Sequence, residues 1–142
     1  MKEIDKQLEI FSRQLMLKDF NEKNFKKIQS KHIIIIGLGG IGCPLAQYLV
    51  SSGIRKITMI DHDKVSLSNL NRQILFSTND LGRLKTKVAY ERLKNINPKS
   101  KIEIISKKIT KNNINNMLNK NTIIVDATDN WKTMNIINNF CV

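Results

Sequence analysis

Short runs of mostly apolar residues punctuate the chain, and segments with a helical spacing of apolar residues separate them. A short apolar run that is rich in isoleucine and valine is typical of a strand buried on both faces of a parallel sheet. We therefore predict strands at residues 33–36, 56–61, 102–105 and 122–126.

Apolar residues recur three or four positions apart in the segments that follow these runs, which predicts helices. Pro44 falls in the first turn of the first helix, and Gly53 is expected to end it. Asn97 and Pro98 end the second helix. The helical positions are Ile41, Leu45, Tyr48 and Leu49; Ala89, Leu93 and Ile96; Ile114, Met117 and Leu118; and Trp131, Met134 and Ile137.

Strands that alternate with helices predict an α/β fold. We expect a Rossmann-like, mostly parallel sheet with helices on both faces, which binds ligands at the carboxyl ends of its strands. Residues 1–30 form a separate, N-terminal helical segment in this prediction, with Phe25 and Ile28 one turn apart and placed to pack on the sheet. Residues 31–142 form the nucleotide-binding domain.

A long polar connection lies between the second strand and the second helix. Residues 62–81 have neither the period of a helix nor that of a strand. Long loops inside compact domains are usually functional or disordered, and apolar anchors favour a functional loop. We expect Leu67, Leu70 and Ile74 to be those anchors.

The composition narrows the classes of partner. The 142-residue chain is 41% hydrophobic, enough to bury the core of one domain. Its formal net charge of +12 would suit nucleic acid, but the basic residues are spread along the chain without the aromatic residues of a base-stacking surface, so we expect no nucleic-acid partner. No apolar segment is long enough to span a bilayer, and we expect no membrane partner. Cys43 and Cys141 form no CxxC pair, which favours a reduced, cytoplasmic setting.

A glycine-rich turn follows the first strand directly. Gly37, Gly39 and Gly42 match the pattern GxGxxG, and Gly40 adds a further glycine. In such a unit the first glycine permits the tight turn, the second lets the backbone approach a phosphate, and the third lets the helix pack on the strand. The N-terminus of that helix attracts the anion. The motif predicts nucleotide binding, with a purely structural glycine turn as the alternative.

An acidic residue closes the second strand. Asp61 lies 24 residues after Gly37, near the spacing at which a carboxylate bonds the ribose hydroxyls of a bound nucleotide. This role would fit NAD as well as ATP. The alternative is a carboxylate that caps the segment after the strand.

Two cations and one further carboxylate favour ATP over NAD. Arg72 lies in the long loop and Lys85 next to the second helix, so both can reach the mouth of the glycine turn. Attack on a nucleotide phosphate requires cations that neutralise the developing charge, and usually Mg²⁺. Asp129, after the last strand, could supply a magnesium ligand. Each of the three also has a structural interpretation, as a solvated charge or a helix cap.

Six segments of the chain together resemble the ThiF/MoeB/HesA family, the bacterial relatives of ubiquitin-activating enzymes. SNLNRQ and the later TDN are the most specific parts of the match, which runs in order from about residue 11 to the end of the chain. The segments are FSRQLML at 11–17, GLGGIGCPLAQYL at 37–49, DHDKVSLSNLNRQ at 61–73, LGRLK at 81–85, NP at 97–98 and DATDN at 126–130.

The resemblance implies an adenylyltransferase. In that reaction the C-terminal glycine carboxylate of a small ubiquitin-like sulfur-carrier protein, which ends in Gly-Gly, attacks the α-phosphate of ATP and releases pyrophosphate. A carboxylate is already ionised at neutral pH, so the step needs no general base. The implied cofactors are ATP and Mg²⁺. Zinc is expected in longer relatives, but this chain has no ligands for it.

The same resemblance implies roles for particular residues. Arg72 and Lys85 would neutralise phosphate charge, Asp129 would bind Mg²⁺, and Asn130 would flank that ligand. Arg13 would act in trans, in the site of the other subunit of a homodimer. The implied nucleotide-binding set is Gly37, Gly39, Gly40, Gly42, Asp61, Ser68, Asn69, Leu70, Asn71, Arg72, Lys85, Asp129 and Asn130.

Departures from the family pattern keep other functions open. The crossover loop, carrier-binding strands and CxxC zinc pairs of longer relatives have no counterpart here, so we expect the C-terminal part of the family fold to be missing. Met134 stands where relatives commonly carry an arginine, and neither Cys43 nor Cys141 is assigned as a sulfur-handling thiol. The alternatives are an NAD-dependent oxidoreductase, motivated by the glycine motif and Asp61, and a truncated, non-catalytic remnant that still binds nucleotide. Carriers of thiamine and of molybdopterin biosynthesis both stay open as the substrate.

Overall fold

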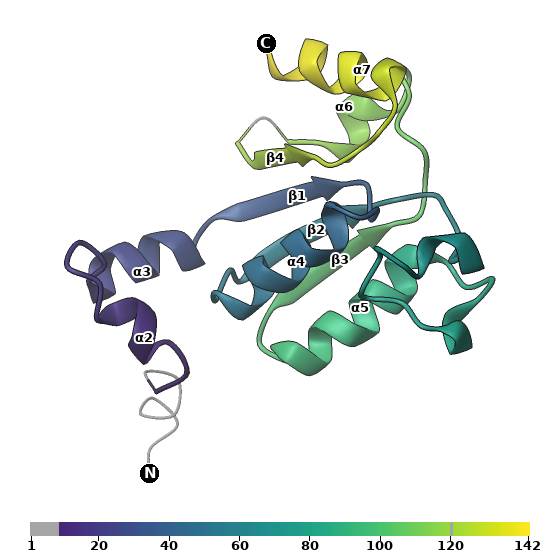
Figure 1. Cartoon of the computed structure of the whole chain (residues 1–142). Coiled ribbons are helices and arrows are strands. Elements are labelled where there is room, and N and C mark those ends of the chain that lie inside the picture. Colours follow the sequence, from purple (N-terminus) through teal and green to yellow (C-terminus); the bar gives the residue numbers. More distant parts are fainter. Residues whose placement is uncertain (1–8, 120) are drawn as a thin grey trace.

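Four parallel strands form one sheet in which β1 lies between β2 and β4 (Figure 1). The computed structural model describes residues 9–119 and 121–142. The order across the sheet is β3-β2-β1-β4, so the chain leaves β1 toward one side and later returns to its other side. A reversal of this kind opens a crevice at the carboxyl ends of the strands. The predicted strands are confirmed as β1 (His32–Ile36), β2 (Lys56–Ile60), β3 (Lys101–Ile105) and β4 (Ile123–Asp126).

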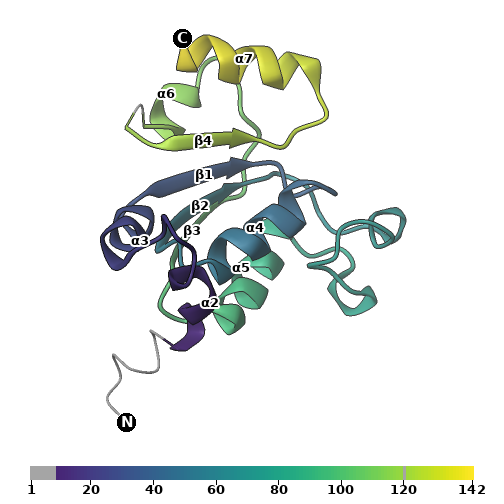
Figure 2. The ribbon, with the colours of Figure 1, turned by 60° about the vertical axis from the view of Figure 1, so that its left-hand side comes forward.

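Helices cover both faces of the sheet, which confirms the predicted fold class (Figure 2). Because successive side chains of a strand point to opposite faces, the isoleucines of β1 serve two layers. Ile33 and Ile35 pack in one layer with α4 and α5, whereas Ile34 and Ile36 pack in the other with α6 and α7. The helices are α4 (Gly42–Ser51), α5 (Lys85–Ile96), α6 (Ile114–Met117) and α7 (Trp131–Cys141).

Among the described residues, two helices precede β1 and lie at the amino end of the sheet (Figure 1). They are α2 (Ser12–Leu15) and α3 (Glu22–Gln29). Both lie in the predicted helical segment 1–30, of which residues 1–8 are outside the described residues.

The side chains of this segment pack on the end of α4 as well as on the sheet. The rings of Phe11 and Phe25 lie with their centroids 4.7 Å apart. A Cβ atom on Gly53 would approach Phe11 to 3.0 Å and Phe25 to 3.1 Å. Gly53 has a φ of +96° directly after α4, as expected of the glycine that ends this helix. Ile28 packs against the core beside β1, as predicted.

The first helix after the glycine turn buries a different face from the one that its apolar residues predict. Ile41 and Tyr48 belong to the predicted stripe, yet they are 71% and 76% exposed. Cys43, Ala46 and Val50 are the positions that pack in the core. Small side chains are favoured there because a helix that begins at a glycine turn lies close to the sheet and leaves little volume to fill.

The last helix is confirmed with two corrections. Ile137 is buried as predicted, but Met134 is 36% exposed. Trp131 is 77% exposed, because it stands in the first turn of α7 at the edge of the fold. The side chain of Asn130 caps this helix by accepting hydrogen bonds from the N–H groups of Lys132 and Thr133. Among the helices of the described residues, none has the length and apolarity needed to cross a membrane.

The long loop between β2 and α5 is closed at its base by backbone pairing. The N–H of Gly82 donates to the carbonyl of Val65, and the N–H of Lys85 donates to the carbonyl of Asp63. The loop contains two short 3-10 helices, η1 (Leu67–Asn69) and η2 (Thr78–Asp80). The two ends of the loop are therefore held together, and the connection is an ordered loop.

Different side chains anchor this loop from those that the sequence predicts. Leu70 packs against the core as expected. Leu67 and Ile74 are 68% and 62% exposed, so the prediction for these two is wrong. Leu75 and Phe76 are buried, together with Val65 at the start of the loop. The turns around η1 change which side chains of the loop face the core, and the spacing of apolar residues in the sequence does not reveal this change.

A buried carboxylate fastens the end of the loop to α5. Asp80 is 2% exposed and accepts hydrogen bonds from the N–H and hydroxyl of Ser77, from Arg83 and from Arg92. Burial raises the pKa of Asp80, but the Ser77 hydroxyl, the Ser77 N–H and the Arg92 guanidinium outweigh it and hold that pKa below its ordinary value. The carboxylate therefore stays charged and keeps the loop in place.

Candidate nucleotide-binding site

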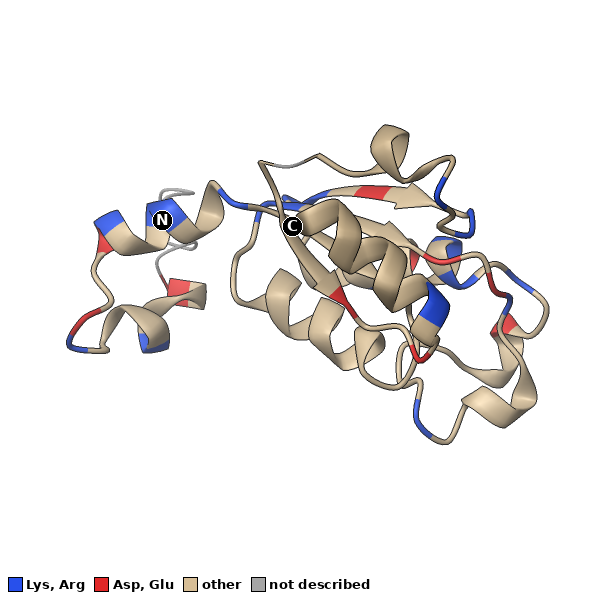
Figure 3. Cartoon of the chain, turned by 90° about the horizontal axis from the view of Figure 1, so that it is seen from above, with Lys and Arg blue, Asp and Glu red and all other residues tan. Residues whose placement is uncertain are grey.

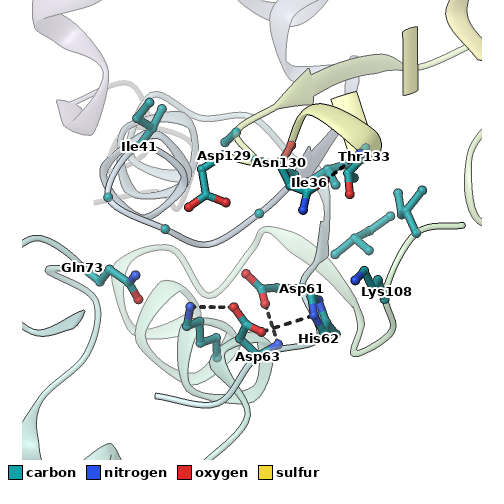
Figure 4. Close-up of a pocket in the computed structure, with 18 of the residues that line it drawn as sticks. Ile36, Ile41, Asp61, His62, Asp63, Gln73, Lys108, Asp129, Asn130 and Thr133 are labelled. Atoms are coloured by element: carbon teal, nitrogen blue, oxygen red, sulfur yellow. Dashed lines mark hydrogen bonds and ion pairs between the residues drawn. The ribbon is translucent and has the colours of Figure 1, made fainter. Parts of the chain in front are cut away.

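A pocket of about 540 Å³ lies at the carboxyl ends of β1, β2 and β4 (Figure 4). The turn after β1, the loop after β2 and the segment after β4 each form part of its wall. This is the place at which the predicted fold class binds ligands. Eight of the predicted nucleotide-binding residues line it: Gly37, Gly39, Gly40, Asp61, Arg72, Lys85, Asp129 and Asn130.

The glycines of the turn do different things. Gly37 has a φ of +94°, and a Cβ there would lie 2.7 Å from the carbonyl oxygen of Ala127. A Cβ on Gly42 would overlap the carbonyl oxygen of Gly37, so Gly42 permits the close packing of helix on turn and does not itself line the pocket. A Cβ on Gly39 would meet no described atom within 4 Å. Gly39 and Gly40 thus present bare backbone to the pocket, as phosphate binding requires.

Asp61 holds this turn in place. Its Oδ2 accepts a hydrogen bond of 2.7 Å from the N–H of Leu38, and its Oδ1 accepts one of 2.7 Å from the N–H of Asp63. The side chain is 8% exposed and still lines the pocket. Each carboxylate oxygen has a second lone pair, so binding of ribose hydroxyls stays a prediction that these contacts allow.

Arg72 is held at the rim of the pocket by its own loop. Its Nη1 donates to the carbonyl of Ser68 at 3.0 Å and to Oδ1 of Asn71 at 3.1 Å, and its N–H donates to the carbonyl of Asn69. Gly40 faces it, because a Cβ there would lie 3.4 Å from the Arg72 side chain. Ser68, Asn69, Leu70 and Asn71 do not line the pocket. The Ser68 carbonyl and the Asn71 side chain hold the guanidinium instead, and the Asn69 carbonyl holds the backbone N–H of Arg72.

Lys85 carries a buried positive charge at the first turn of α5. Its side chain is 6% exposed, and Nζ lies 3.3 Å from Oδ2 of Asp63. Asp63 also lies 3.3 Å from Nε2 of His62. A buried ammonium needs a counter-charge, and Asp63 supplies it at a point where an anionic ligand could do the same.

Asp129 is the residue that best fits a cation. Its carboxylate points into the pocket in Figure 4, and no partner among the described residues holds it. Asp61, His62 and Asp63 also gather potential metal ligands within 4.8 Å of one another, but Asp61 is bound to two N–H groups and Asp63 to Lys85. A free, hard carboxylate oxygen beside a phosphate site is what Mg²⁺ prefers.

Some residues that line the pocket were not predicted from the sequence. Lys107 and Lys108 follow β3 and bring two further cations to the pocket, and Ile109 adds a buried apolar side. The rule that places ligands at carboxyl ends could have found all three, because β3 belongs to the same parallel sheet. Gln73, next to Arg72, was also missed.

Arg13 and the cysteines lie apart from the pocket. Arg13 belongs to α2, at the opposite end of the sheet in Figure 1, so it cannot reach this chain's own site from there. Burial raises the pKa of the Cys43 thiol to about 11, and the thiol donates to the carbonyl of Leu38. Cys141 is exposed at the end of α7. Neither cysteine lines the pocket.

The bare glycine turn, the carboxylate at the end of β2 and the converging cations make this pocket the candidate nucleotide-binding site of a Rossmann-like fold. The chain belongs to the ThiF family, which matches residues 11–142.

Two relatives are each longer than this chain, which matches only part of their length. The sulfur carrier protein ThiS adenylyltransferase of Escherichia coli K12 is 37% identical over 132 residues, which are 93% of this chain and 53% of that protein. The sulfur carrier protein adenylyltransferase of Thermus thermophilus is 32% identical over 136 residues, 96% of this chain and 50% of that protein. The chain therefore spans about half the length of these relatives.

Solved structures share the fold over nearly the whole chain. E. coli tRNA N6-threonylcarbamoyladenosine dehydratase, TcdA, in complex with ATP matches 96% of this chain and 56% of its own, with a TM-score of 0.88 and 30% identity. E. coli MccB with ATP matches 83% of this chain and 35% of its own, with a TM-score of 0.78 and 32% identity. Both of these proteins were therefore solved with the nucleotide that the sequence predicts here.

Proposed function

We propose that the chain carries the ATP site of an adenylyltransferase that activates the C-terminal carboxylate of a ubiquitin-like sulfur-carrier protein. The observation that carries the proposal is that Arg72, Lys85 and Asp129 meet around a bare glycine turn. No partner in the described part of the chain holds Asp129. This set suits a triphosphate with a divalent cation better than a dinucleotide, which has one pyrophosphate to neutralise. The ATP complexes of TcdA and MccB support the same ligand.

The reaction would be one in-line displacement at phosphorus. A carboxylate oxygen forms a bond to the α-phosphorus, the bond to the bridging oxygen breaks, and that electron pair leaves with pyrophosphate. The products are an acyl-adenylate and pyrophosphate. No proton moves, because the carboxylate is ionised at neutral pH, so the pocket needs charge stabilisation more than a general base.

Each part of the pocket suits one part of ATP. The backbone of Gly39 and Gly40 would hold the phosphates, and Asp61 the ribose hydroxyls. Arg72 and Lys85 would neutralise the charge that develops as pyrophosphate leaves. Asp129 would hold Mg²⁺, which would supply further neutralisation of the phosphate charge.

The relatives favour one kind of partner, and the position of α2 bears on the assembly. The E. coli and Thermus relatives are named for sulfur carrier proteins, which favours a carrier of that kind over other carboxylates. Carriers of the thiamine and molybdopterin pathways are both candidates. Arg13 lies on α2, away from this chain's own pocket, so a role in catalysis would require a homodimer in which it enters the partner's site.

A carboxylate borne on tRNA is the second candidate substrate. It is motivated by the similarity to TcdA, whose name specifies a tRNA nucleoside, and by the net charge of +12. In Figure 3, however, Lys and Arg lie on separate elements with Asp and Glu among them, and they do not form a single basic face in that view. This distribution favours the protein carrier.

Exchange of labelled pyrophosphate into ATP tests the proposal. With Mg²⁺ and a carrier that ends in Gly-Gly, we expect exchange, and we expect none with a carrier that lacks the last glycine. Arg72→Ala should slow the exchange by about 100-fold, because one stabilising donor to the transition state is lost. Arg55→Ala, an exposed arginine outside the pocket, is the matched control. ATP binding without exchange would favour the non-catalytic alternative, and exchange stimulated by tRNA alone would favour the second substrate.

A further inference from the structure

Gln73 is turned into the pocket although its neighbours in sequence are exposed. Gln73 is 3% exposed, whereas Ile74 is 62% exposed. Its side chain lines the pocket and points into it from the long loop (Figure 4). The residue directly follows Arg72, at which the predicted nucleotide-binding stretch ends.

The backbone on both sides fixes this orientation. The N–H of Gln73 donates to the carbonyl of Asn69 at 3.0 Å, and the carbonyl of Gln73 accepts from the N–H of Phe76 at 3.1 Å. Leu75 and Phe76 are themselves buried. Because the loop is anchored on both sides of Gln73, the backbone at this position is held against the pocket wall.

The amide oxygen of Gln73 is buried, and no group in residues 9–119 or 121–142 donates to it. Oε1 has no hydrogen-bond partner among the described residues. A buried acceptor without a donor is unfavourable and rare in folded proteins. In the same loop Asp80 receives four hydrogen bonds, so the loop is otherwise well satisfied. The unsatisfied oxygen therefore points to a group that arrives with a ligand.

The position of Gln73 limits which group of a bound ligand could satisfy Oε1. In Figure 4 Gln73 and Lys108 lie on opposite sides of Asp61. Under the proposed function ribose occupies Asp61, which leaves the phosphates for the side of Gln73 and Arg72. Phosphate oxygens only accept hydrogen bonds at neutral pH, so they cannot satisfy Oε1. A divalent cation and the waters bound to it can, because Mg²⁺ takes oxygen ligands and keeps several waters.

We propose that Gln73 is a binding residue for the cation that accompanies the triphosphate, with Oε1 in or next to its coordination shell. This inference rests on the proposed function, since it takes the ligand to be Mg²⁺–ATP. A carboxamide suits the place because it supplies an oxygen without adding a negative charge beside the phosphates. Asp129 and Gln73 would then approach the cation from different walls of the pocket.

Calorimetric titration of the full chain with Mg²⁺–ATP, ATP in EDTA and AMP tests this. In Gln73→Leu, which keeps the volume and removes the oxygen, we expect the Kd for Mg²⁺–ATP to rise roughly tenfold. The Kd for ATP in EDTA and that for AMP should change less than about twofold. The melting temperature without ligand should stay the same or rise, because an unsatisfied oxygen is gone. Gln47→Leu, on α4 and outside the pocket, is the matched control.

The outcomes separate this inference from the proposed function. Failure of the wild-type chain to bind Mg²⁺–ATP would refute the proposed function. Two results would overturn the role of Gln73 if the wild-type chain binds Mg²⁺–ATP. In the first, Gln73→Leu has the same Kd for Mg²⁺–ATP as the wild type. In the second, Gln73→Leu loses affinity equally for Mg²⁺–ATP, ATP in EDTA and AMP. If Gln73→Leu does not fold, Gln73→Glu tests the inference in its place, because the glutamate keeps an oxygen at the position of Oε1. Its ATP binding should still depend on Mg²⁺, and loss of that dependence would overturn the inference.

Discussion

The N–H of Leu38 donates to Oδ2 of Asp61 across 2.7 Å, which joins the turn after β1 to the end of β2. The other oxygen of the same carboxylate accepts from the N–H of Asp63. The side chain that the sequence predicts to bind ribose therefore also shapes the phosphate turn. Under the proposed function, the Asp61 carboxylate therefore serves both the fold and the ligand.

Asp61→Asn should lower both stability and nucleotide affinity. The amide keeps one accepting oxygen and turns an NH₂ group toward a backbone N–H, so one of the two hydrogen bonds is lost. We expect the free energy of unfolding to fall by about 1–3 kcal/mol. Urea denaturation measures the change, and a midpoint equal to that of the wild type would show that Asp61 does not hold the turn.

Gly37→Ala and Gly39→Ala should separate folding from binding within one turn. Gly37 combines a φ of +94° with a close approach to Ala127, so alanine there should destabilise the fold by about 2 kcal/mol or more. Gly39 has open space toward the pocket, so alanine there should fold normally and weaken ATP binding. Thermal melting and an ATP titration report the two effects. The reverse pattern would contradict the assignment of the glycines.

The stability of the chain should fall as the pH drops below about 6.5, in part because of His32. Burial and the Lys56 ammonium lower the pKa of His32 in the folded state, although Glu103 opposes them. Below its ordinary value of 6.5 the unfolded chain therefore binds more protons than the folded chain, and protons favour unfolding. Urea midpoints at about pH 7.5 and about pH 5.5 should differ less for His32→Gln than for the wild type. An equal difference would exclude His32 as a source of the effect.

The two cysteines should differ sharply in reactivity. Thiolates are the reactive form, and Cys43 is buried with a pKa raised to about 11, whereas Cys141 is exposed. Iodoacetamide at about pH 8 should modify Cys141 in the folded chain and Cys43 only after unfolding. Peptide mass spectrometry identifies the labelled site, and rapid labelling of Cys43 in the folded chain would mean that its surroundings open.

The sequence predicted the strands and the residues of the pocket better than it predicted which faces are buried. An apolar run such as that of residues 33–36 is unambiguous, because every position is buried whichever way it points. The apolar stripe that contains Ile41 and Tyr48 predicted the wrong buried face of α4. Packing close to the glycine turn favours the small residues Cys43 and Ala46 instead.

Side-chain contacts inside the pocket could not be predicted from spacing. The pairing of Lys85 with Asp63 depends on the backbone ladder that closes the long loop. The inward turn of Gln73 depends on the bends around η1. Lys107 and Lys108 are different, because their place after β3 made them accessible to prediction.

Calorimetric titration of the chain with Mg²⁺–ATP and with NADH shows which nucleotide the pocket prefers. We expect Mg²⁺–ATP to bind at least about tenfold more tightly than NADH. We also expect Arg72→Ala to remove most of that preference, because a phosphate-neutralising cation is lost. Tighter binding of NADH than of Mg²⁺–ATP by the wild-type chain would contradict this expectation.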